Sequence, residues 1–254
     1  MTQRPSATFV FGLAVAGRAV ASALCNSGAT VFVGDDKLND DHRSFAQQIG
    51  AQIVEHSTST EFAQVMREVE ILAPAPGVPE HHAVIRSARE FGVNIQSEIE
   101  IGYRIESKRL GGPRPMLAIT GTDGKTTTTL MVNSMLEAAG FRSQAVGNTD
   151  IPLIEALQSD AQAFSVECSS FRLEYTEQFR ALASVWLNIA PDHLDWHSNY
   201  QRYFDAKAKM WANCLPNDIA VAPIDDVNIC EIARSSAARV VTRSEEHTSE
   251  LQSH

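Results

Sequence analysis

The segment that most constrains the fold is an apolar run that enters a glycine-containing turn and then a run of helix formers. Residues 117–129 read LAITGTDGKTTTT, and helix-forming residues follow from 130 to 139. Gly121 and Gly124 allow the backbone to curl so that successive N–H groups point inward at an anion. A helix that starts at the anion adds the attraction of its N-terminal dipole. This strand–loop–helix order predicts a phosphate-binding loop.

The side chains of this loop indicate a nucleotide with its magnesium ion. Lys125 can reach the β- and γ-phosphates, and the Thr126 hydroxyl can ligate Mg²⁺. Ile119 stands where the usual G-x-x-x-x-G-K-[ST] pattern has its first glycine, so the loop is a shortened variant. The alternative, a glycine turn before a surface helix, is disfavoured because Gly-Lys-Thr stands in the strand-to-helix context.

Size, charge and cysteine spacing limit the class of protein to which this chain can belong. A chain of 254 residues corresponds to one large or two ordinary domains. The net charge of −10 argues against a nucleic-acid or membrane-surface role, although a local basic pocket for a nucleotide remains compatible with it. The cysteines are far apart and form no C-x-x-C pair, so a reducing cytoplasm fits better than a zinc or disulfide framework. We expect no signal peptide and no membrane insertion.

Strands and helices alternate along the chain, which predicts a doubly wound parallel sheet and an α/β fold. The expected strands lie at residues 7–13, 29–34, 71–73, 93–96, 117–120, 144–147, 163–167, 183–188 and 219–222, and helices at 17–26 and 81–91. A polar stretch rich in glycine and proline at residues 107–115 is the linker candidate. We therefore expect a Rossmann-like domain over residues 1–108 and a second α/β domain, which carries the phosphate loop, over 109–242.

The last residues, 243–254, are polar and aperiodic. They resemble translated sequencing-adapter read-through at the end of a broken gene model. We expect them to be a non-native tail, with a genuine disordered tail as the alternative.

The first strand-to-helix turn carries a weaker nucleotide signature. Residues 12–17 read GLAVAG, which is G-x-A-x-x-G with Ala14 in place of the middle glycine, and the next strand ends at Asp35 and Asp36. The pattern alone suggests a dinucleotide fold, but Ala14 hinders close approach of a pyrophosphate, so a different nucleotide is at least as compatible. Residues 74–77, PAPG, follow a strand at the edge where such sheets bind ligands, and simple turn punctuation is the alternative.

A carboxylate and two serines follow at another expected strand end. Glu167 opens the run ECSSFRLE at residues 167–174. It would project near the phosphate loop, where its oxygens can hold Mg²⁺. Ser169 and Ser170 could donate to phosphate or carboxylate oxygens. A capping serine beside an exposed glutamate is the alternative.

The run NIAPDHLDWH at residues 188–197 supplies two histidines. The spacing of His193 and His197 could suit zinc, but no third protein ligand and no H-E-x-x-H are evident. His193 is better assigned as a ligand of a second metal or as a phosphate contact, with a hydrogen-bonded loop residue as the alternative. Lys207, in the helical run 203–211, would by itself be a solvated surface lysine.

These pieces in this order resemble the Mur ligases, which are ATP-dependent amide-bond-forming enzymes of peptidoglycan synthesis. GTDGKT at residues 121–126 is similar to the family's ATP loop. ECSSFRLE is similar to the E-x-S-S-F-Q-L signature of the D-glutamate-adding branch, with Arg172 in place of the glutamine. The N-x-x-x-D-H-L-D block and Y-x-x-x-K at residues 203–207 keep the family's order and approximate spacing. The resemblance covers residues 7 to 242.

The resemblance implies ATP and Mg²⁺ as cofactors and gives roles to individual residues. The catalytic residues would be Lys125, His193 and Lys207. The ATP-binding residues would be Gly121, Thr122, Asp123, Gly124, Lys125, Thr126 and Thr127. The metal ligands would be Thr126, Glu167, His193 and Lys207, the last after carbamylation by CO₂ and thus partly buried. The UDP-substrate would be bound by Gly12, Leu13, Ala14, Gly17, Asp35, Asp36, Pro76, Gly77, Asn148 and Ser169.

The implied reaction joins D-glutamate to UDP-N-acetylmuramoyl-L-alanine. The alanyl carboxylate attacks the γ-phosphate of ATP to give an acyl phosphate, and the amine of D-glutamate then displaces phosphate through a tetrahedral intermediate. Both steps develop negative charge, which Lys125 and Mg²⁺ would stabilise. Family members continue into a third domain and are expected to be monomers at full length. We therefore expect this chain to bind UDP-sugar substrate, to bind ATP weakly and not to ligate D-glutamate at a useful rate.

Three other interpretations remain. A sister ligase that adds another amino acid, including the folate polyglutamylating enzymes, is disfavoured by the E-x-S-S-F block. A nicotinamide-dependent oxidoreductase built on residues 12–17 would leave the phosphate loop and the D-H-L-D block unexplained. A nucleotide-binding module without catalysis is the third.

Overall fold

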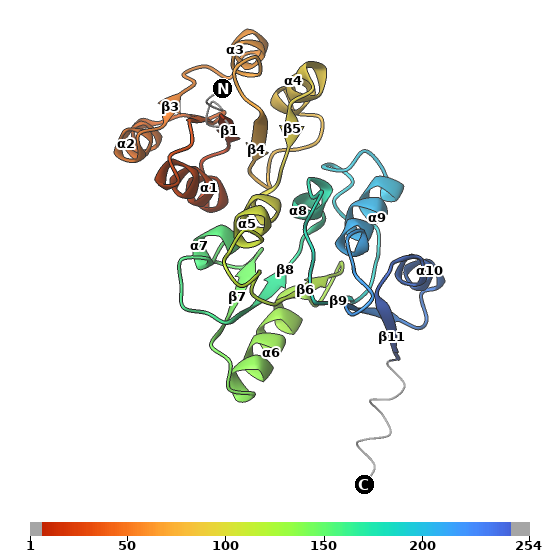
Figure 1. Ribbon diagram of the computed structural model, residues 1–254. Coiled ribbons are helices and arrows are strands. Elements are labelled where there is room, and N and C mark those ends of the chain that lie inside the picture. The colour runs from red at the N-terminus through yellow and green to blue at the C-terminus, as the bar shows by residue number, and fades with distance from the viewer. Residues whose placement is uncertain (1–6, 245–254) are drawn as a thin grey trace.

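The computed structural model describes residues 7–244, which form two parallel β-sheets with helices on both sides (Figure 1). The first sheet has the strand order β3-β2-β1-β4-β5, and all its pairings are parallel. Its strands are β1 (Thr8–Phe11), β2 (Val31–Gly34), β3 (Gln52–Ile53), β4 (Ile71–Pro74) and β5 (Asn94–Ile95). Its helices are α1 (Val15–Asn26), α2 (Asp40–Ile49), α3 (Ser59–Val65) and α4 (Ala83–Phe91).

The second sheet has the order β11-β10-β9-β6-β8-β7 and is also parallel throughout. Its strands are β6 (Met116–Thr120), β7 (Ser143–Gly147), β8 (Ala163–Glu167), β9 (Ala183–Trp186), β10 (Ile219–Pro223) and β11 (Arg239–Arg243). Its helices are α6 (Lys125–Ala138), α7 (Leu153–Ala156), α8 (Ser170–Glu174), α9 (Tyr200–Ala208) with the 3₁₀ turn η1 (Lys209–Trp211), and α10 (Val227–Ser235). The predicted fold class, a Rossmann-like sheet followed by an α/β unit with a phosphate loop, is confirmed.

Several boundaries differ from the predicted ones for local reasons. β1 ends at Phe11 because Gly12 turns the chain with φ of 93°. The helix after the phosphate loop begins at Lys125, directly after Gly124, so it starts at the loop as predicted. β11, which was not predicted, reaches Arg243, whereas residues 245–254 of the expected tail lie outside the described residues.

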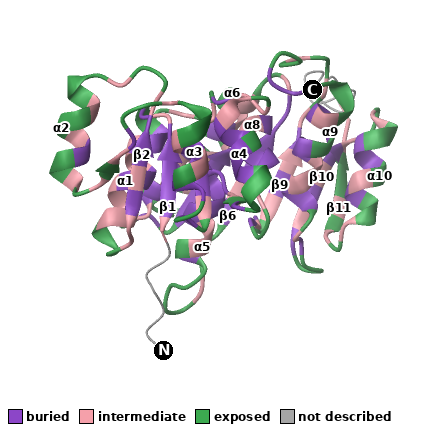
Figure 2. Ribbon diagram, turned by 90° about the horizontal axis from the view of Figure 1, so that it is seen from above, coloured by how far each residue is buried: buried purple, intermediate pink, exposed green. Residues whose placement is uncertain are grey.

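Burial follows the pattern that a parallel sheet covered on both faces requires. Every residue of β1 and of β8 is buried, and the outer faces of the helices carry the exposed residues (Figure 2). Behind the second sheet, Trp186 and Trp211 pack with ring centroids 5.7 Å apart and are both buried. Within residues 7–244, no helix combines the length and the apolar character that crossing a bilayer needs.

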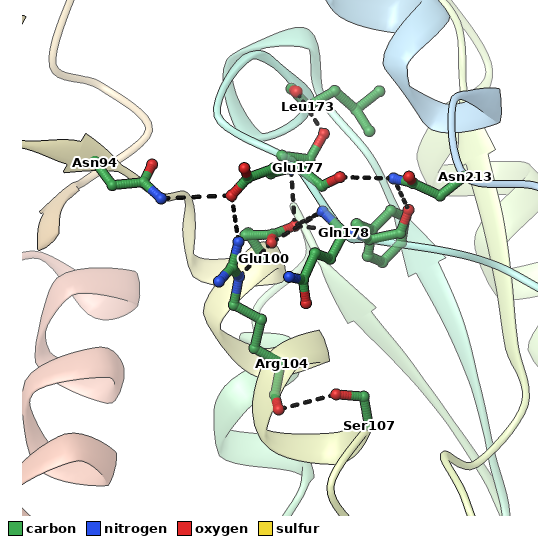
Figure 3. A network of polar contacts seen from close by, with 10 residues as sticks. Asn94, Glu100, Arg104, Ser107, Leu173, Glu177, Gln178 and Asn213 are labelled. Atoms are coloured by element: carbon green, nitrogen blue, oxygen red, sulfur yellow. Dashed lines mark hydrogen bonds and ion pairs between the residues drawn. The ribbon is translucent and has the colours of Figure 1, made fainter.

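Helix α5 (Glu98–Glu106) connects the two sheets and is anchored by a buried carboxylate. Glu100 is fully buried and accepts hydrogen bonds from the backbone N–H groups of residues 177–179 at 2.9 to 3.0 Å. It also pairs with Arg104 Nε at 2.6 Å (Figure 3). One carboxylate thus fixes α5 to the turn that precedes β9.

Two more buried carboxylates of α5 point to the second unit. Glu98 pairs with Arg172 of α8 and accepts from the N–H of Ile154 at 2.7 Å. Burial raises the pKa of the Glu98 carboxyl despite the neighbouring guanidinium. Glu106 pairs with Arg114 Nε at 2.8 Å, beside the expected linker. Helix α5 is therefore held by the second unit along its whole length.

Candidate active site

The carboxyl ends of four neighbouring strands meet at one edge of the second sheet, where parallel α/β sheets bind ligands. In sheet order these strands are β9, β6, β8 and β7. The segments that follow them are residues 187–197, the phosphate loop 121–124, residues 168–169 and Asn148. The topology therefore brings together groups that are up to about 80 residues apart in the chain.

The phosphate loop has the backbone that the sequence predicted. Gly124 adopts a left-handed conformation, with φ of 78°, immediately before α6, and no side chain caps the helix there. The first N–H groups of a helix have no partner within it, so those of α6 can face an anion. Gly121 also leaves little room for a side chain, because a Cβ at this position would lie 3.0 Å from Leu187 Cβ.

Glu167 lies beside this loop, as its place at a strand end indicated. Its Oε2 accepts from Thr126 Oγ1 at 2.8 Å, and its Oε1 accepts from Asn148 Nδ2 at 3.0 Å. Close backbone packing brings Asn148 there, since a Cβ at Gly147 would lie 2.4 Å from the Glu167 carbonyl oxygen. The three predicted residues Thr126, Glu167 and Asn148 therefore form one hydrogen-bonded group.

Two lysines contact the front of the loop. Lys125 Nζ donates to Thr122 O at 2.6 Å, and Lys207 Nζ donates to Gly121 O at 2.7 Å. Lys207 is 1% exposed and sits 4.6 Å from the centroid of the Tyr203 ring, so it is not the surface lysine that its helix alone suggests. Burial, and then the charge of Lys125, lower the pKa of Lys207 to about 7.

His193 lies in the same neighbourhood, in a conformation that is unusual for a residue with a side chain. Its φ is 52°, the one left-handed φ of a non-glycine residue among residues 7–244. The centroid of its ring lies 4.6 Å from the ring centroid of Phe171 and 6.3 Å from that of Tyr203, the ring that Lys207 contacts. Its side chain is 43% exposed, so it can reach a ligand.

The second histidine of the predicted pair has another role. His197 is fully buried, and its Nε2 lies 2.9 Å from Ser170 Oγ. Burial lowers its pKa to about 4. Across residues 7–244, no three His, Cys, Asp or Glu side chains form a group that could hold a metal ion by themselves. Ser169 is buried and caps α8 by accepting from the N–H of Arg172 at 3.4 Å.

Most of the residues predicted to bind the UDP-substrate within the first unit line a separate hollow of about 310 Å³, whereas Leu13 and Gly17 are not part of its lining. It lies between β1 and β4, where the strand order reverses. Its lining includes Gly12, Ala14, Asp35, Asp36, Pro76 and Gly77.

The glycines and one aspartate of this hollow shape its backbone. A Cβ at Gly12 would lie 2.7 Å from Ala75 Cβ, and a Cβ at Gly17 would lie 1.9 Å from Gly12 O. Asp35 accepts from the N–H of Leu13 at 2.7 Å, and Leu13 itself is buried. Its other oxygen accepts from the N–H of Lys37 at 2.8 Å. Asp35 therefore holds the turn together.

Asp36 makes a different contact and keeps more of its surface. Its Oδ2 lies 3.1 Å from His82 Nε2, and its side chain is 55% exposed. Of the two acidic residues at the end of β2, Asp36 is the one more available to a ligand.

Sequence reasoning assigned no role to Asn188 or Tyr203, yet both contact the phosphate loop. The signal for Asn188 was its position at a strand end, as the first residue of the N-x-x-x-D-H-L-D block. Nothing in the sequence pointed to the hydroxyl of Tyr203.

Comparison with known proteins agrees with this geometry. The family description "Mur ligase middle domain" matches residues 119–254, from the phosphate loop onward. The chain belongs to the Mur ligase family. Curated relatives carry the name UDP-N-acetylmuramoylalanine--D-glutamate ligase. That of Natranaerobius thermophilus is 35% identical over 234 residues, which cover 91% of this chain and 51% of the relative. That of Rhodococcus jostii is 37% identical over 239 residues, which cover 92% and 47%.

This Mur ligase chain thus spans about half the length of the curated relatives it matches. Among solved structures, the UDP-N-acetylmuramate:L-alanyl-gamma-D-glutamyl-meso-diaminopimelate ligase from Neisseria meningitides matches 94% of this chain and 78% of its own, with a TM-score of 0.58 and 14% identity. The UDP-N-acetylmuramate-alanine ligase of Thermotoga maritima matches 94% and 52%, with a TM-score of 0.51 and 21% identity. At these identities the likeness establishes the fold.

Proposed function

We propose that this chain is the substrate- and nucleotide-binding part of an ATP-dependent ligase that joins D-glutamate to UDP-N-acetylmuramoyl-L-alanine. The observation that carries the proposal is the convergence of Lys125, Thr126, Glu167 and Lys207 on one phosphate loop. The names of the curated relatives and the ECSSFRLE run at residues 167–174 support the D-glutamate branch.

ATP would lie with its phosphates on the first N–H groups of α6. Lys125 would exchange its bond to Thr122 O for the β- and γ-phosphates, and its charge would stabilise the negative charge that develops during transfer. The remaining loop residues, Gly121, Thr122, Asp123, Gly124, Thr126 and Thr127, complete the ATP site.

The residues beside the loop also fit a magnesium ion. The Thr126 hydroxyl and the Glu167 carboxylate are hard oxygen donors, already in contact with each other, and Asn148 orients the carboxylate. Bound Mg²⁺ would neutralise charge on the phosphates. His193, on the exposed side of the site, would supply a further ligand or a phosphate contact.

Lys207 is proposed to carry a carbamate. A buried lysine with a pKa of about 7 is partly neutral at neutral pH. The free amine attacks the carbon of CO₂ and loses a proton, which leaves a carboxylate on the lysine nitrogen. This group would stand beside the phosphate loop and act as an additional oxygen ligand.

The UDP moiety would occupy the hollow of the first unit. Gly12 and Gly17 allow close approach of the backbone, Pro76 and Gly77 would line the site, and Asp36 would recognise a hydroxyl or N–H of the nucleoside. Asp35, Leu13 and Ala14 form the turn beneath it. Asn148 and Ser169 would meet the sugar-linked end of the substrate. The Ser169 oxygen would contact the substrate while it also accepts the capping hydrogen bond from the N–H of Arg172.

In the whole enzyme the alanyl carboxylate attacks the γ-phosphate, and the amine of D-glutamate then displaces phosphate from the acyl phosphate. We expect this chain alone to bind substrate and, weakly, ATP, without ligating D-glutamate at a useful rate. We place the reaction in the cytoplasm, where free thiols such as the four cysteines of this chain persist.

Calorimetry with ATP tests the nucleotide site. We expect ATP to bind only with Mg²⁺. Lys125→Ala should weaken this binding about 100-fold, because a charged partner of the phosphates is lost. Glu167→Gln should make the binding less dependent on Mg²⁺. Lys108→Ala, at an exposed position of the linker stretch, is the matched control and should bind like the wild type. Equal binding by Lys125→Ala and Lys108→Ala would overturn the proposal.

A further inference from the structure

The front of the phosphate loop, residues 121–123, is held by a side chain from the segment that follows β9. Asn188 Oδ1 accepts from the N–H of Thr122 and from that of Asp123, both at 2.9 Å. Its Nδ2 donates to Asp123 O at 3.2 Å. One carboxamide thus makes three hydrogen bonds to the backbone of the loop.

The shortened loop explains why the Asn188 carboxamide is needed as a hydrogen-bond donor and acceptor. Ile119, at the position of the missing glycine, is part of β6 and pairs with Glu167 in β8 and Val185 in β9. The turn therefore starts later and has fewer residues with which to satisfy its backbone. The backbone N–H groups of Thr122 and Asp123 take their partners from residue 188 instead.

Asn188 is itself fixed in place. Its carbonyl oxygen accepts from Trp186 Nε1 at 3.1 Å, and Trp186 is fully buried. Glycine at 121 leaves the room that Asn188 needs, since a Cβ there would lie 3.3 Å from its Oδ1. The carboxamide is therefore held in place just after the carboxyl end of β9.

A second contact holds the same residue of the loop. Thr122 Oγ1 lies 3.0 Å from Tyr203 OH and accepts from the N–H of Ala190 at 2.9 Å. Burial raises the pKa of Tyr203 to about 12, so its hydroxyl keeps its proton. Thr122 is thus fixed through its backbone by Asn188 and through its side chain by Tyr203.

We propose that Asn188 is a positioning residue of the nucleotide site, an inference that rests on the proposed ATP function. By occupying the N–H groups of Thr122 and Asp123, it leaves those from Gly124 onward to face the phosphates. It also fixes the carbonyl of Thr122, on which Lys125 rests before nucleotide arrives. Asn188 acts through the loop and does not touch the reacting atoms.

Three variants separate this role from general stabilisation. Asn188→Ala removes every side-chain bond to the loop, and Asn188→Asp keeps an acceptor for both N–H groups but loses the donor to Asp123 O. Asn213→Ala is the matched control, because the Asn213 carboxamide also bonds backbone groups, with Nδ2 donating to the carbonyls of Glu177 and Phe179, away from the loop. Two quantities are measured: residue-resolved amide hydrogen exchange of the chain without ligand, and calorimetric affinity for Mg·ATP.

In Asn188→Ala we expect at least ten-fold faster exchange at Asp123, whereas Thr122 keeps the hydrogen bond from its N–H to the backbone carbonyl of residue 188 at 3.2 Å. We also expect a roughly ten-fold weaker affinity for Mg·ATP, while Asn213→Ala leaves exchange and affinity unchanged. Asn188→Asp should restore slow exchange at the Asp123 amide. Wild-type exchange and affinity in Asn188→Ala, or an equal loss of affinity in Asn213→Ala, would overturn the inference. A wild type that does not bind Mg·ATP would refute the proposed function, and the exchange rates would still decide whether Asn188 holds the loop.

Discussion

Replacing Glu100 with alanine tests whether buried carboxylates hold the two sheets together through α5. The carboxylate is fully buried and accepts from three consecutive backbone N–H groups, those of residues 177–179, besides pairing with Arg104 (Figure 3). Glu100→Ala leaves these N–H groups without a partner, at about 1–3 kcal/mol each where water cannot replace it. Breaking a buried ion pair typically costs about 3–5 kcal/mol, and we expect the same range for the loss here.

The assay is urea denaturation followed by far-UV circular dichroism, with the midpoint and slope fitted separately. A change in midpoint at constant slope reports stability. Glu177→Ala is the control: it removes the other carboxylate partner of Arg104, but that side chain is 64% exposed, so we expect a loss below about 1 kcal/mol. The reasoning is refuted if the two variants lose the same stability, or if Glu100→Ala loses less than about 1 kcal/mol.

Two further predictions concern pH and backbone packing. Burial lowers the pKa of His197 from 6.5 to about 4, so its contribution to stability is present above pH 6.5 and is lost as the pH falls through about 4. His197→Phe should show a flatter fall of unfolding free energy over this window, and parallel curves would contradict it. Gly147 and Gly140 have similar φ values, 100° and 89°, but only at Gly147 would a Cβ meet backbone, at 2.4 Å from Glu167 O. Gly147→Ala should therefore lower the free energy of unfolding by about 1–3 kcal/mol more than Gly140→Ala does, and it should weaken Mg·ATP binding. Equal denaturation midpoints and equal affinities in the two variants would contradict this prediction.

The elements that local pattern determines were predictable from the sequence. The apolar runs of the central strands and the Gly-Lys-Thr turn gave the parallel sheets, the phosphate loop and the position of Glu167. The short strand β3 and the mostly exposed β11 carry too little apolar signal to be read as strands. Glu98 and Glu100 would be assigned to a solvent face, because their partners come from segments more than fifty residues away.

The same limit applies at the site. Lys207 is buried against the phosphate loop, where it bonds Gly121 O, 86 residues earlier in the chain. The sequence of its own helix does not indicate this burial. The role of Asn188 depends on the pairing of β6 with β9, which no local pattern reports. Motif resemblance identified Lys207 as special, whereas Asn188 and Tyr203 required the three-dimensional arrangement.

Calorimetric binding of UDP-N-acetylmuramoyl-L-alanine to the purified chain, with UDP and NAD as comparators, tests the central claim most directly. We expect tight binding of the full substrate, weaker binding of UDP and no binding of NAD. Binding of NAD in place of the uridine ligands, or no binding of any of the three by a chain that still melts cooperatively, would contradict it.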